Sequence, residues 1–395
     1  MRIAIIAPDS LPIPSKLGGA IETLTTSLLE YNERSSDPCE FTVFNKFRKH
    51  VVLDNSYAST NLVFIKENVV VSFVYKYFWA ILRRVLRRDL YPRSNFISKC
   101  VEEIEKHNYD YILVEGGCYQ ILQIKSAMST KIILHLHTDI LNIKTPLCRE
   151  TTRACYKILC VSDYLKERLI EIDNSNRDKT FILKNCIDLK LFRKNEMFRS
   201  EIRSQLNICA SDMLIMYCGR LSEEKGVKEL LLAFEAMGVR NTKLVIVGSS
   251  WFSSNIKTEY VRSLELIAER IGESVVFTGY IEQKILPRYY SAADIFVCPS
   301  TGNEAAGLVV VEALACGVPA IVTRKGGLVE YASLDSCEFI NCDNNFVGNI
   351  REALIRMVKE RGYYQEKRKM TRKSVGMFNL DDYYYNFRNL IKEKV

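Results

Sequence analysis

Two glutamates, Glu304 and Glu312, flank a segment that could bind a phosphate. Glu304 lies in a loop, and Glu312 lies in the second turn of a helix expected to begin near Gly307 and to end at Gly317. The free N–H groups and positive dipole end of such a helix attract anions. Helical side chains lean toward that end, so Glu312 can reach a ligand there. Carboxylates accept hydrogen bonds from sugar hydroxyls, so the pattern suits a nucleotide sugar. A core helix with two solvated glutamates would show the same pair.

Two cations follow another strand of the same half. Arg220 and Lys225 lie in a loop directly after an apolar run at 214–218. An arginine offers a bidentate fork and a lysine a point charge, so together they can neutralise a diphosphate leaving group. The alternative is ordinary surface charge on a loop. If the loops converge, cations bind one end of the ligand and acids the other.

Alternating strands and helices are expected to position these loops. The strands of the first half are expected at 3–7, 41–44, 62–65, 111–115, 131–137 and 157–161, and those of the second half at 214–218, 244–248, 275–279, 295–299 and 318–323. Helical patterns lie between them. This alternation predicts an α/β protein with two Rossmann-like, doubly wound domains that face each other across a cleft.

The sequence is expected to divide into three segments. The polar, charged passage after residue 192 separates a first domain, 1–192, from a second, 193–375. A tyrosine-rich C-terminal helix within 376–395 is expected to return to the first domain. Gly18-Gly19, after the first strand, could let the backbone approach a phosphate or could simply make a turn, and spacing alone does not decide.

Composition narrows the class of protein. The 395 residues carry a net charge of +8 and 13 cysteines without a CxxC pair, which favours a cytosolic enzyme with reduced thiols. The N-terminus lacks a signal-peptide pattern, and no apolar run is long enough to span a bilayer. His135-Leu136-His137 is the only histidine grouping with a metal-like spacing, and neither a metal nor a cofactor is expected.

One basic, aromatic stretch suggests a surface contact. From Tyr75 to Arg88 the chain mixes aromatic residues with four arginines at helical spacing, including Arg83 and Arg84. This pattern is typical of a helix in an anionic membrane interface, and equally of a domain helix with a solvated basic edge. Nucleic-acid binding is not expected, because the aromatic side chains fall on the apolar face.

Taken together, these motifs identify a resemblance that runs nearly end to end. The chain resembles the retaining glycosyltransferases of family 4, which have the two-domain GT-B fold. The resemblance is carried by Gly219-Arg220, Lys225-Gly226, the Glu304 and Glu312 pair, Cys316-Gly317-Val318-Pro319, Gly326-Gly327 with Glu330, Val161-Ser162, and Asn185 with Asp188 and Phe192.

The resemblance implies roles for the polar residues. Arg220 and Lys225 would bind the donor diphosphate, Glu312 the ribose, and Glu304 the hydroxyls of the donor sugar. His137 matches the family's histidine beside that sugar. Glu304, His137, Lys225 and Arg220 are therefore the expected catalytic residues, and His135 is assigned to structure.

The resemblance also implies backbone contacts to the donor. The segment Ala306-Gly307-Leu308 would contact sugar and phosphate. Gly279-Tyr280-Ile281 matches the segment that lines the base, and Gly18-Gly19 matches the loop that closes over the phosphates.

The expected activity is transfer of a hexosyl or N-acetylhexosaminyl group, with retention, from a UDP-sugar such as UDP-GlcNAc or UDP-glucose to a glycan. Within the family, residues 134–137 and 248–252 look most like enzymes of surface-polysaccharide, lipopolysaccharide and spore-coat assembly. The acceptor is expected to be a glycan or lipid-linked glycan, and the enzyme cytoplasmic and peripheral at the inner face of the membrane. The alternatives are a nucleotide-sugar epimerase and a non-catalytic scaffold of the same fold.

Overall fold

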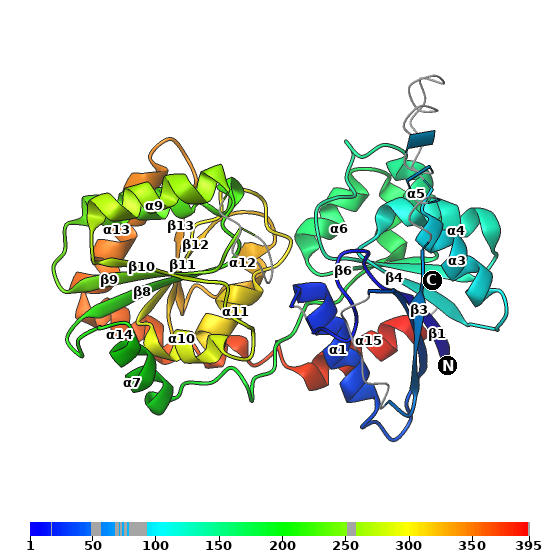
Figure 1. The fold of residues 1–395 in the computed structure, drawn as a ribbon, viewed down its shortest axis with the longest axis horizontal. Coiled ribbons are helices and arrows are strands. Elements are labelled where there is room, and N and C mark those ends of the chain that lie inside the picture. The colour runs from blue at the N-terminus through cyan, green and yellow to red at the C-terminus, as the bar shows by residue number, and fades with distance from the viewer. Residues whose placement is uncertain are drawn as a thin grey trace. The chain divides into compact units, whose positions relative to one another are not determined.

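The computed structural model describes residues 1–16, 18–48, 57–67, 71, 73–74, 77–78, 93–250 and 258–393 (Figure 1). The chain forms two compact units. The N-terminal unit comprises Met1–Lys184 together with Tyr383–Val395, and the C-terminal unit comprises Asn185–Asp382. The change of unit at Lys184 lies upstream of the boundary expected at residue 192, and the last residues of the chain are grouped with the N-terminal unit.

The N-terminal unit is built on a seven-stranded parallel sheet in the order β3-β2-β1-β4-β5-β6-β7. Its strands are β1 (Arg2–Ile6), β2 (Glu40–Lys46), β3 (Thr60–Ile65), β4 (Tyr111–Glu115), β5 (Lys131–Leu136), β6 (Lys157–Cys160) and β7 (Thr180–Ile182). Its helices are α1 (Ala20–Asn32), α3 (Asn95–Ile104), α4 (Ile121–Ala127), α5 (Cys148–Ala154), α6 (Asp163–Ile170) and, from Tyr383 onward, α15 (Leu380–Lys392). The central strands are continuous aliphatic runs because helices cover both of their faces, and Ile3 to Ile6 are fully buried.

The C-terminal helix α15 completes the N-terminal unit. Tyr384 donates its hydroxyl hydrogen to Oδ1 of Asn32 at 2.8 Å, and the buried Phe387 packs its ring 6.4 Å from that of Phe41. The ammonium group of Lys157, at the start of β6, donates to the carbonyls of Leu390 and Glu393. A lysine can be buried at this position because the carbonyls at the helix C-terminus satisfy its donors.

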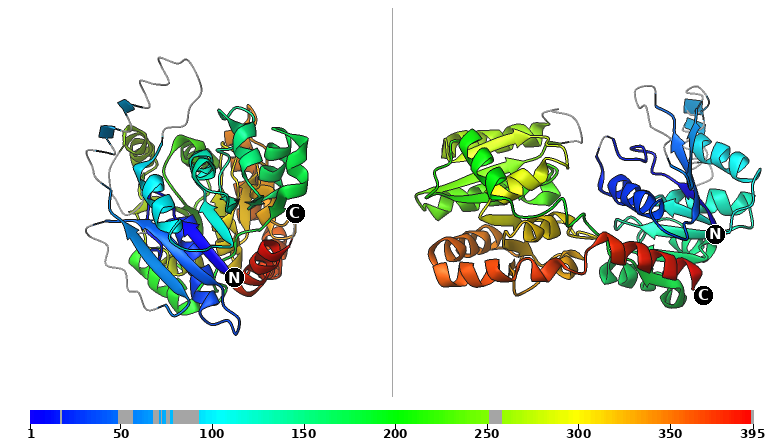
Figure 2. Two further views of the ribbon diagram at one scale, coloured as in Figure 1. Left: turned by 90° about the vertical axis from the view of Figure 1, so that its right-hand side faces the viewer. Right: turned by 90° about the horizontal axis from the view of Figure 1, so that it is seen from below.

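The C-terminal unit has a six-stranded parallel sheet in the order β10-β9-β8-β11-β12-β13. Its strands are β8 (Met213–Cys218), β9 (Thr242–Val247), β10 (Val275–Gly279), β11 (Ile295–Cys298), β12 (Ala320–Thr323) and β13 (Cys337–Ile340). Its helices are α7 (Glu196–Gln205), α8 (Val227–Met237), α9 (Glu259–Ile271), α10 (Leu286–Ala292), α11 (Leu308–Ala315), α12 (Leu328–Tyr331), α13 (Phe346–Lys359) and α14 (Arg361–Met370). Figure 2 shows two further views of both units.

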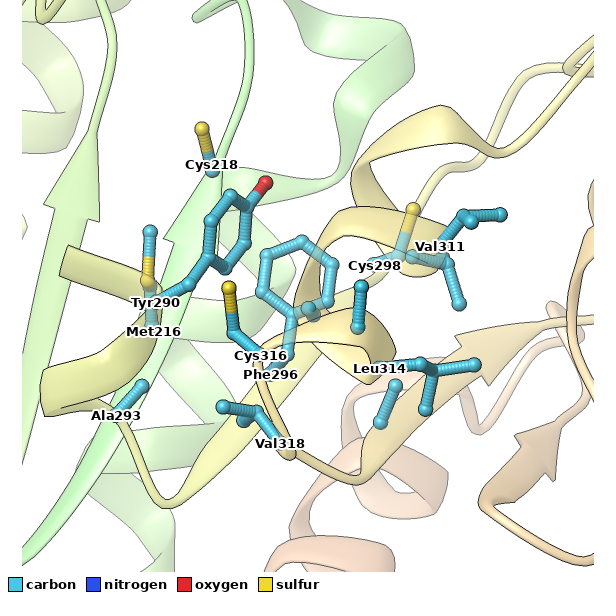
Figure 3. Packing of buried hydrophobic residues seen from close by; sticks show 14 of the residues in the cluster. Met216, Cys218, Tyr290, Ala293, Phe296, Cys298, Val311, Leu314, Cys316 and Val318 are labelled. Atoms are coloured by element: carbon cyan, nitrogen blue, oxygen red, sulfur yellow. The ribbon is translucent and has the colours of Figure 1, made fainter. Parts of the chain in front are cut away.

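Helices on both faces of this second sheet bury two hydrophobic cores. Successive strand side chains point to opposite faces, so Ile215 and Tyr217 join the core beneath α8, α9 and α13. Met216 and Cys218 join the core beneath α7, α10 and α11 (Figure 3). Long apolar runs such as 295–298 arise because a central parallel strand is buried on both sides.

Both sheets share one topological feature. The strand order reverses direction between β1 and β4 in the first sheet and between β8 and β11 in the second. In doubly wound sheets, ligands bind beyond the carboxyl ends of the strands at this switch point. The predicted α/β class with two doubly wound domains is confirmed.

The basic aromatic stretch from Tyr75 to Arg88 lies outside the described residues except for Tyr77 and Phe78, which are exposed. Its contact with a membrane stays a prediction. Among the helices of the described ranges, none combines the length and the apolar character needed to cross a bilayer.

Candidate functional site

The two loops expected to bind the donor meet at the switch point of the C-terminal unit. One follows β8 and carries Lys225, and the other follows β11 and carries Glu304. The N–H groups of Thr301 and Gly302 both donate to the carbonyl of Glu224, at 2.9 and 3.1 Å. Gly226 has a φ of +67°, and a Cβ there would lie 1.9 Å from the Pro299 carbonyl oxygen. The loops therefore pack backbone against backbone, and only glycine fits at the contact.

Lys225 and Glu304 are in direct contact. Nζ of Lys225 lies 2.6 Å from Oε1 of Glu304, and the side chains are 23% and 21% exposed. Ser300 donates its hydroxyl hydrogen to the same oxygen at 2.6 Å. A lysine ammonium has three donors, so Lys225 can bind Glu304 and a phosphate oxygen together. From the sequence we expect cations at one end of the ligand and acids at the other. In the structure, one of the cations, Lys225, contacts one of the acids, Glu304.

The backbone of Glu304 is held by the Gly326-Gly327 turn. The N–H of Gly327 donates to the Glu304 carbonyl at 2.7 Å. Gly326 has a φ of +54°, and a Cβ there would lie 2.3 Å from the same carbonyl oxygen. This explains the glycine pair in physical terms, since a side chain at Gly326 would push the Glu304 loop away from β12.

Arg220 lies on the same loop as Lys225 but near its exposed side. Its guanidinium is 3.0 Å from Oε1 of Glu224, and both side chains are more than two-fifths exposed. Such a surface pair contributes little to stability, so the guanidinium can exchange this partner for an anion at small cost. The position of the loop is better fixed: the Tyr217 hydroxyl donates to the Arg220 carbonyl at 2.8 Å.

Helix α11 begins at Leu308, next to Gly307 as expected, and ends at Ala315, before the expected Gly317. A Cβ at Gly307 would lie 2.8 Å from Cδ1 of Leu328, so this segment packs closely against α12. Ala306 and Leu308 flank the glycine at the start of the helix, partly buried against the core. The expected backbone contacts of 306–308 thus fall at the helix N-terminus, next to the loop that carries Glu304.

Glu312 is buried, with only 5% of its surface exposed. Its Oε2 accepts a hydrogen bond of 2.9 Å from the hydroxyl of Tyr290, and Gln283 supplies another side-chain hydrogen bond. Burial raises the pKa of Glu312 to about 7, although both hydrogen bonds act to lower it. Glu312 is therefore not a solvated glutamate on a core helix.

The segment expected to line the base, Gly279-Tyr280-Ile281, continues from the carboxyl end of β10. The Gly248 N–H donates to the Gly279 carbonyl at 3.0 Å, which ties the ends of β9 and β10 together. Ile281 packs against the core beneath α10 and α11. The segment lies at the same edge of the sheet as the loops that carry Lys225 and Glu304.

In the N-terminal unit, the Gly18-Gly19 turn separates β1 from α1. Both glycines have positive φ angles, 85° and 97°. A Cβ at Gly19 would lie 2.1 Å from Oε2 of Glu22, so the carboxylate lies directly against the turn. Glu22 is 3% exposed, and burial raises its pKa.

His137 belongs to a buried cluster at the switch point of this first sheet. Oε2 of Glu115, the last residue of β4, lies 2.8 Å from Nε2 of His137 and 3.1 Å from Nδ1 of His135. Burial opposes the charge of Glu115, but the two imidazoles outweigh this effect and hold its pKa at about 2. Burial, with the neighbouring His135, lowers the pKa of His137 to about 4.

Sequence reasoning missed two residues of these sites, Glu115 and Tyr290. Glu115 had a detectable signal, because it is an acid at the end of a buried strand that neighbours the strand of His135. Tyr290 had none, since a tyrosine in an apolar helix is usually only part of the core.

The cluster of Glu115, His135 and His137 also has the composition of a metal site. One potential ligand atom of each residue lies within 4.8 Å of the others. Metal-bound histidines usually donate their second N–H to an acceptor, whereas Nε2 of His135 is buried and has no partner among the described residues. The expectation that the protein needs no metal stays a prediction.

Comparison with known proteins gives two matches to family models. Residues 198–374 match the model for glycosyl transferases group 1, and residues 67–191 match the model for glycosyltransferase family 4. The chain is similar to spore coat protein SA of Bacillus subtilis (strain 168), with 27% identity over 83% of this chain and 82% of that protein. It is also similar to lipopolysaccharide 1,2-N-acetylglucosaminetransferase of Salmonella typhimurium, with 28% identity over 66% of each chain.

Solved structures share the fold. Anabaena Alr3699/HepE in complex with UDP and glucose superimposes with a TM-score of 0.75 and 16% identity, covering 99% of both chains. The lipopolysaccharide outer core galactosyltransferase WaaB in its apo form superimposes with a TM-score of 0.69 and 17% identity, covering both chains fully.

Proposed function

Because this chain belongs to the family 4 glycosyltransferases and has their GT-B fold, we propose that it transfers a hexosyl or N-acetylhexosaminyl group from a UDP-sugar to a glycan acceptor with retention of configuration. The observation that carries the proposal is the contact between Lys225 and Glu304 at the switch point between β8 and β11. A cation and an acid held 2.6 Å apart suit a ligand whose phosphate and sugar adjoin.

The proposed chemistry follows from the loop that carries both cations. Charge develops on the diphosphate as its bond to the sugar breaks, and the ammonium of Lys225 and the guanidinium of Arg220 stabilise that charge. Glu304 binds hydroxyls of the donor sugar. We propose that the acceptor attacks from the face of the leaving group, because Lys225 and Ser300 already engage Oε1 of Glu304, which suits a binding group better than a nucleophile.

UDP is proposed as the nucleotide by analogy. Alr3699/HepE was crystallised with UDP, with UDP and glucose, and with UDP-glucose, and it shares the fold at low sequence identity. In this chain the ends of β9 and β10 meet at Gly248 and Gly279, and the following Tyr280 and Ile281 are half-buried. A flat uracil base can pack against a half-buried segment of this kind.

The acceptor is proposed to be a bacterial surface glycan, either free or linked to a lipid. The names of several relatives support this class: a spore coat protein, a lipopolysaccharide N-acetylglucosaminetransferase and a putative teichuronic acid biosynthesis glycosyltransferase.

A thermal-shift screen against UDP-, GDP-, ADP- and dTDP-sugars tests the donor. A ligand at 100 times its Kd stabilises the native state by about 2.7 kcal/mol, which shifts the unfolding temperature measurably. We expect the largest shift with a UDP-sugar, and a much smaller one for Lys225→Ala. Equal shifts in the variant and the wild type would contradict the site.

Incubation of the protein with the UDP-sugar alone separates transfer from epimerisation. A transferase leaves the free UDP-sugar unchanged or hydrolyses it slowly, and it releases UDP rapidly only when a glycan acceptor is added. Conversion of the sugar to its epimer without an acceptor would overturn the proposed transfer.

A further inference from the structure

Tyr290 is a fully buried tyrosine whose hydroxyl reaches a functional carboxylate. It lies on α10, with 0% of its surface exposed, and its hydroxyl donates to Oε2 of Glu312 on α11 at 2.9 Å. The thiol of Cys218, at the end of β8, lies beside the same hydroxyl (Figure 3). The hydroxyl group of Tyr290 therefore lies near the edge of the sheet where β8 and β11 end, although its ring lies in the core.

The aromatic ring of Tyr290 is fixed by its neighbours. The ring of Phe296 on β11 lies 5.6 Å away between centroids, and the ring of Phe192 lies 6.1 Å away. All three side chains are at most 1% exposed and belong to one core. Because such a core is closely packed, the hydroxyl cannot swing away from Glu312.

The hydrogen bond from Tyr290 limits the rotation of the Glu312 carboxylate. Burial disfavours the anion of Glu312, and a donor at 2.9 Å offsets part of that effect. With Oε2 held by Tyr290 and Gln283 as a second side-chain donor, the carboxylate keeps one plane and presents the lone pairs that remain in fixed directions. A carboxylate fixed in this way can accept hydrogen bonds from two neighbouring hydroxyls of one ring.

We infer that Tyr290 is a positioning residue that holds Glu312 for both ribose hydroxyls, and that it thereby makes the site select ribonucleotides over 2′-deoxyribonucleotides. The inference rests on the proposed function, which assigns Glu312 to the ribose of the donor. The selected ligand class is a nucleoside diphosphate, or its sugar ester, with a free vicinal diol.

Calorimetric titration of UDP and of 2′-deoxy-UDP tests the inference. Loss of one hydrogen bond to a charged acceptor corresponds to about tenfold or more in affinity, so the wild type is expected to prefer UDP by at least about tenfold. In Tyr290→Phe, which keeps the ring and its packing, this preference is expected to fall below about threefold. Tyr289→Phe is the matched control, because Tyr289 precedes it on the same helix, partly buried against the same core, and should keep the wild-type ratio.

A double-mutant comparison shows whether Tyr290 acts through Glu312. Glu312→Gln alone is expected to reduce the preference for UDP, and adding Tyr290→Phe should change it no further. If the two substitutions reduced the preference for UDP independently, so that their effects multiplied in the double variant, the inference would be wrong. Tyr290→Phe could fail to fold because the Glu312 charge loses its donor. The double variant has no such buried charge, so its preference for UDP over 2′-deoxy-UDP can then be compared with that of Glu312→Gln, and equal preferences support the inference.

The outcomes separate this inference from the proposed function. A wild type that binds neither UDP nor 2′-deoxy-UDP would contradict the proposed donor. A wild type that binds both equally, or a Tyr290→Phe variant that keeps the full preference, would refute the role of Tyr290 while the proposed donor stands.

Discussion

The buried carboxyl of Glu312 predicts a specific dependence of stability on pH. Its pKa lies at about 7 in the folded protein, against an ordinary value of 4.5. A carboxyl whose pKa rises on folding stabilises the protein fully below the unfolded value, and this contribution is lost as the pH rises through the folded value. The difference between 4.5 and about 7 corresponds to about 3 kcal/mol, and about 2.5 kcal/mol of it falls between pH 5 and pH 8. Glu312→Gln keeps the shape of the side chain but cannot ionise.

Amide hydrogen exchange measures this effect within one unit. At each pH, the protection of β8 and β11 in the wild type is compared with that in Glu312→Gln, so the intrinsic exchange rates cancel. Between pH 5 and pH 8 the variant should gain about 2.5 kcal/mol relative to the wild type. Strands β1 and β4 of the N-terminal unit serve as the internal control and should not differ. If the gap between variant and wild type were the same at both pH values, burial would not raise the pKa of Glu312.

Three further predictions concern the charged groups of the two switch points. Lys225→Ala and Glu304→Gln should each lower transfer by about 100-fold or more while leaving the unfolding temperature nearly unchanged; a steady-state assay of UDP release with the acceptor checks this, and wild-type turnover in either variant would contradict the site. Glu115→Gln should reduce the exchange protection of β4 and β5 at pH 7, since the anion, with its pKa held at about 2, stabilises the fold above its ordinary value of 4.5 and loses this effect as the pH falls toward 2. Unchanged protection at pH 7 would show that the carboxylate adds nothing to that unit. Dialysis against EDTA should leave transfer and unfolding temperature unchanged, whereas a loss that zinc restores would make the cluster around Glu115 and His137 a metal site.

The fold could be predicted because central parallel strands leave a strong signal. A strand buried on both faces is a short aliphatic run, and each run precedes a loop at the same edge of the sheet. The strands missed by this reasoning lack that signal. β7 (Thr180–Ile182) is very short, and β13 (Cys337–Ile340) is interrupted by Glu338, whose carboxylate is paired with Arg356.

The candidate site could be predicted only at the level of its loops. Residue types and strand ends identified the loops that carry Lys225 and Glu304, but not their direct contact, which depends on backbone hydrogen bonds between the loops. Likewise, Glu115 and Tyr290 act through single hydrogen bonds in the interior. A pattern of apolar and polar residues records which face is buried, and it does not record which buried hydroxyl meets which carboxylate.

Helix α15 has a consequence for how the protein is made. The N-terminal unit combines Met1–Lys184 with residues that are synthesised much later, Tyr383–Val395, after the whole of the C-terminal unit. Until those residues are synthesised, the Lys157 ammonium lacks the carbonyls of Leu390 and Glu393, and Phe41 lacks the covering ring of Phe387. The C-terminal unit, whose sequence is continuous, can fold first during translation. A chain shortened before Tyr383 would therefore leave the N-terminal unit, rather than the C-terminal unit, incompletely folded.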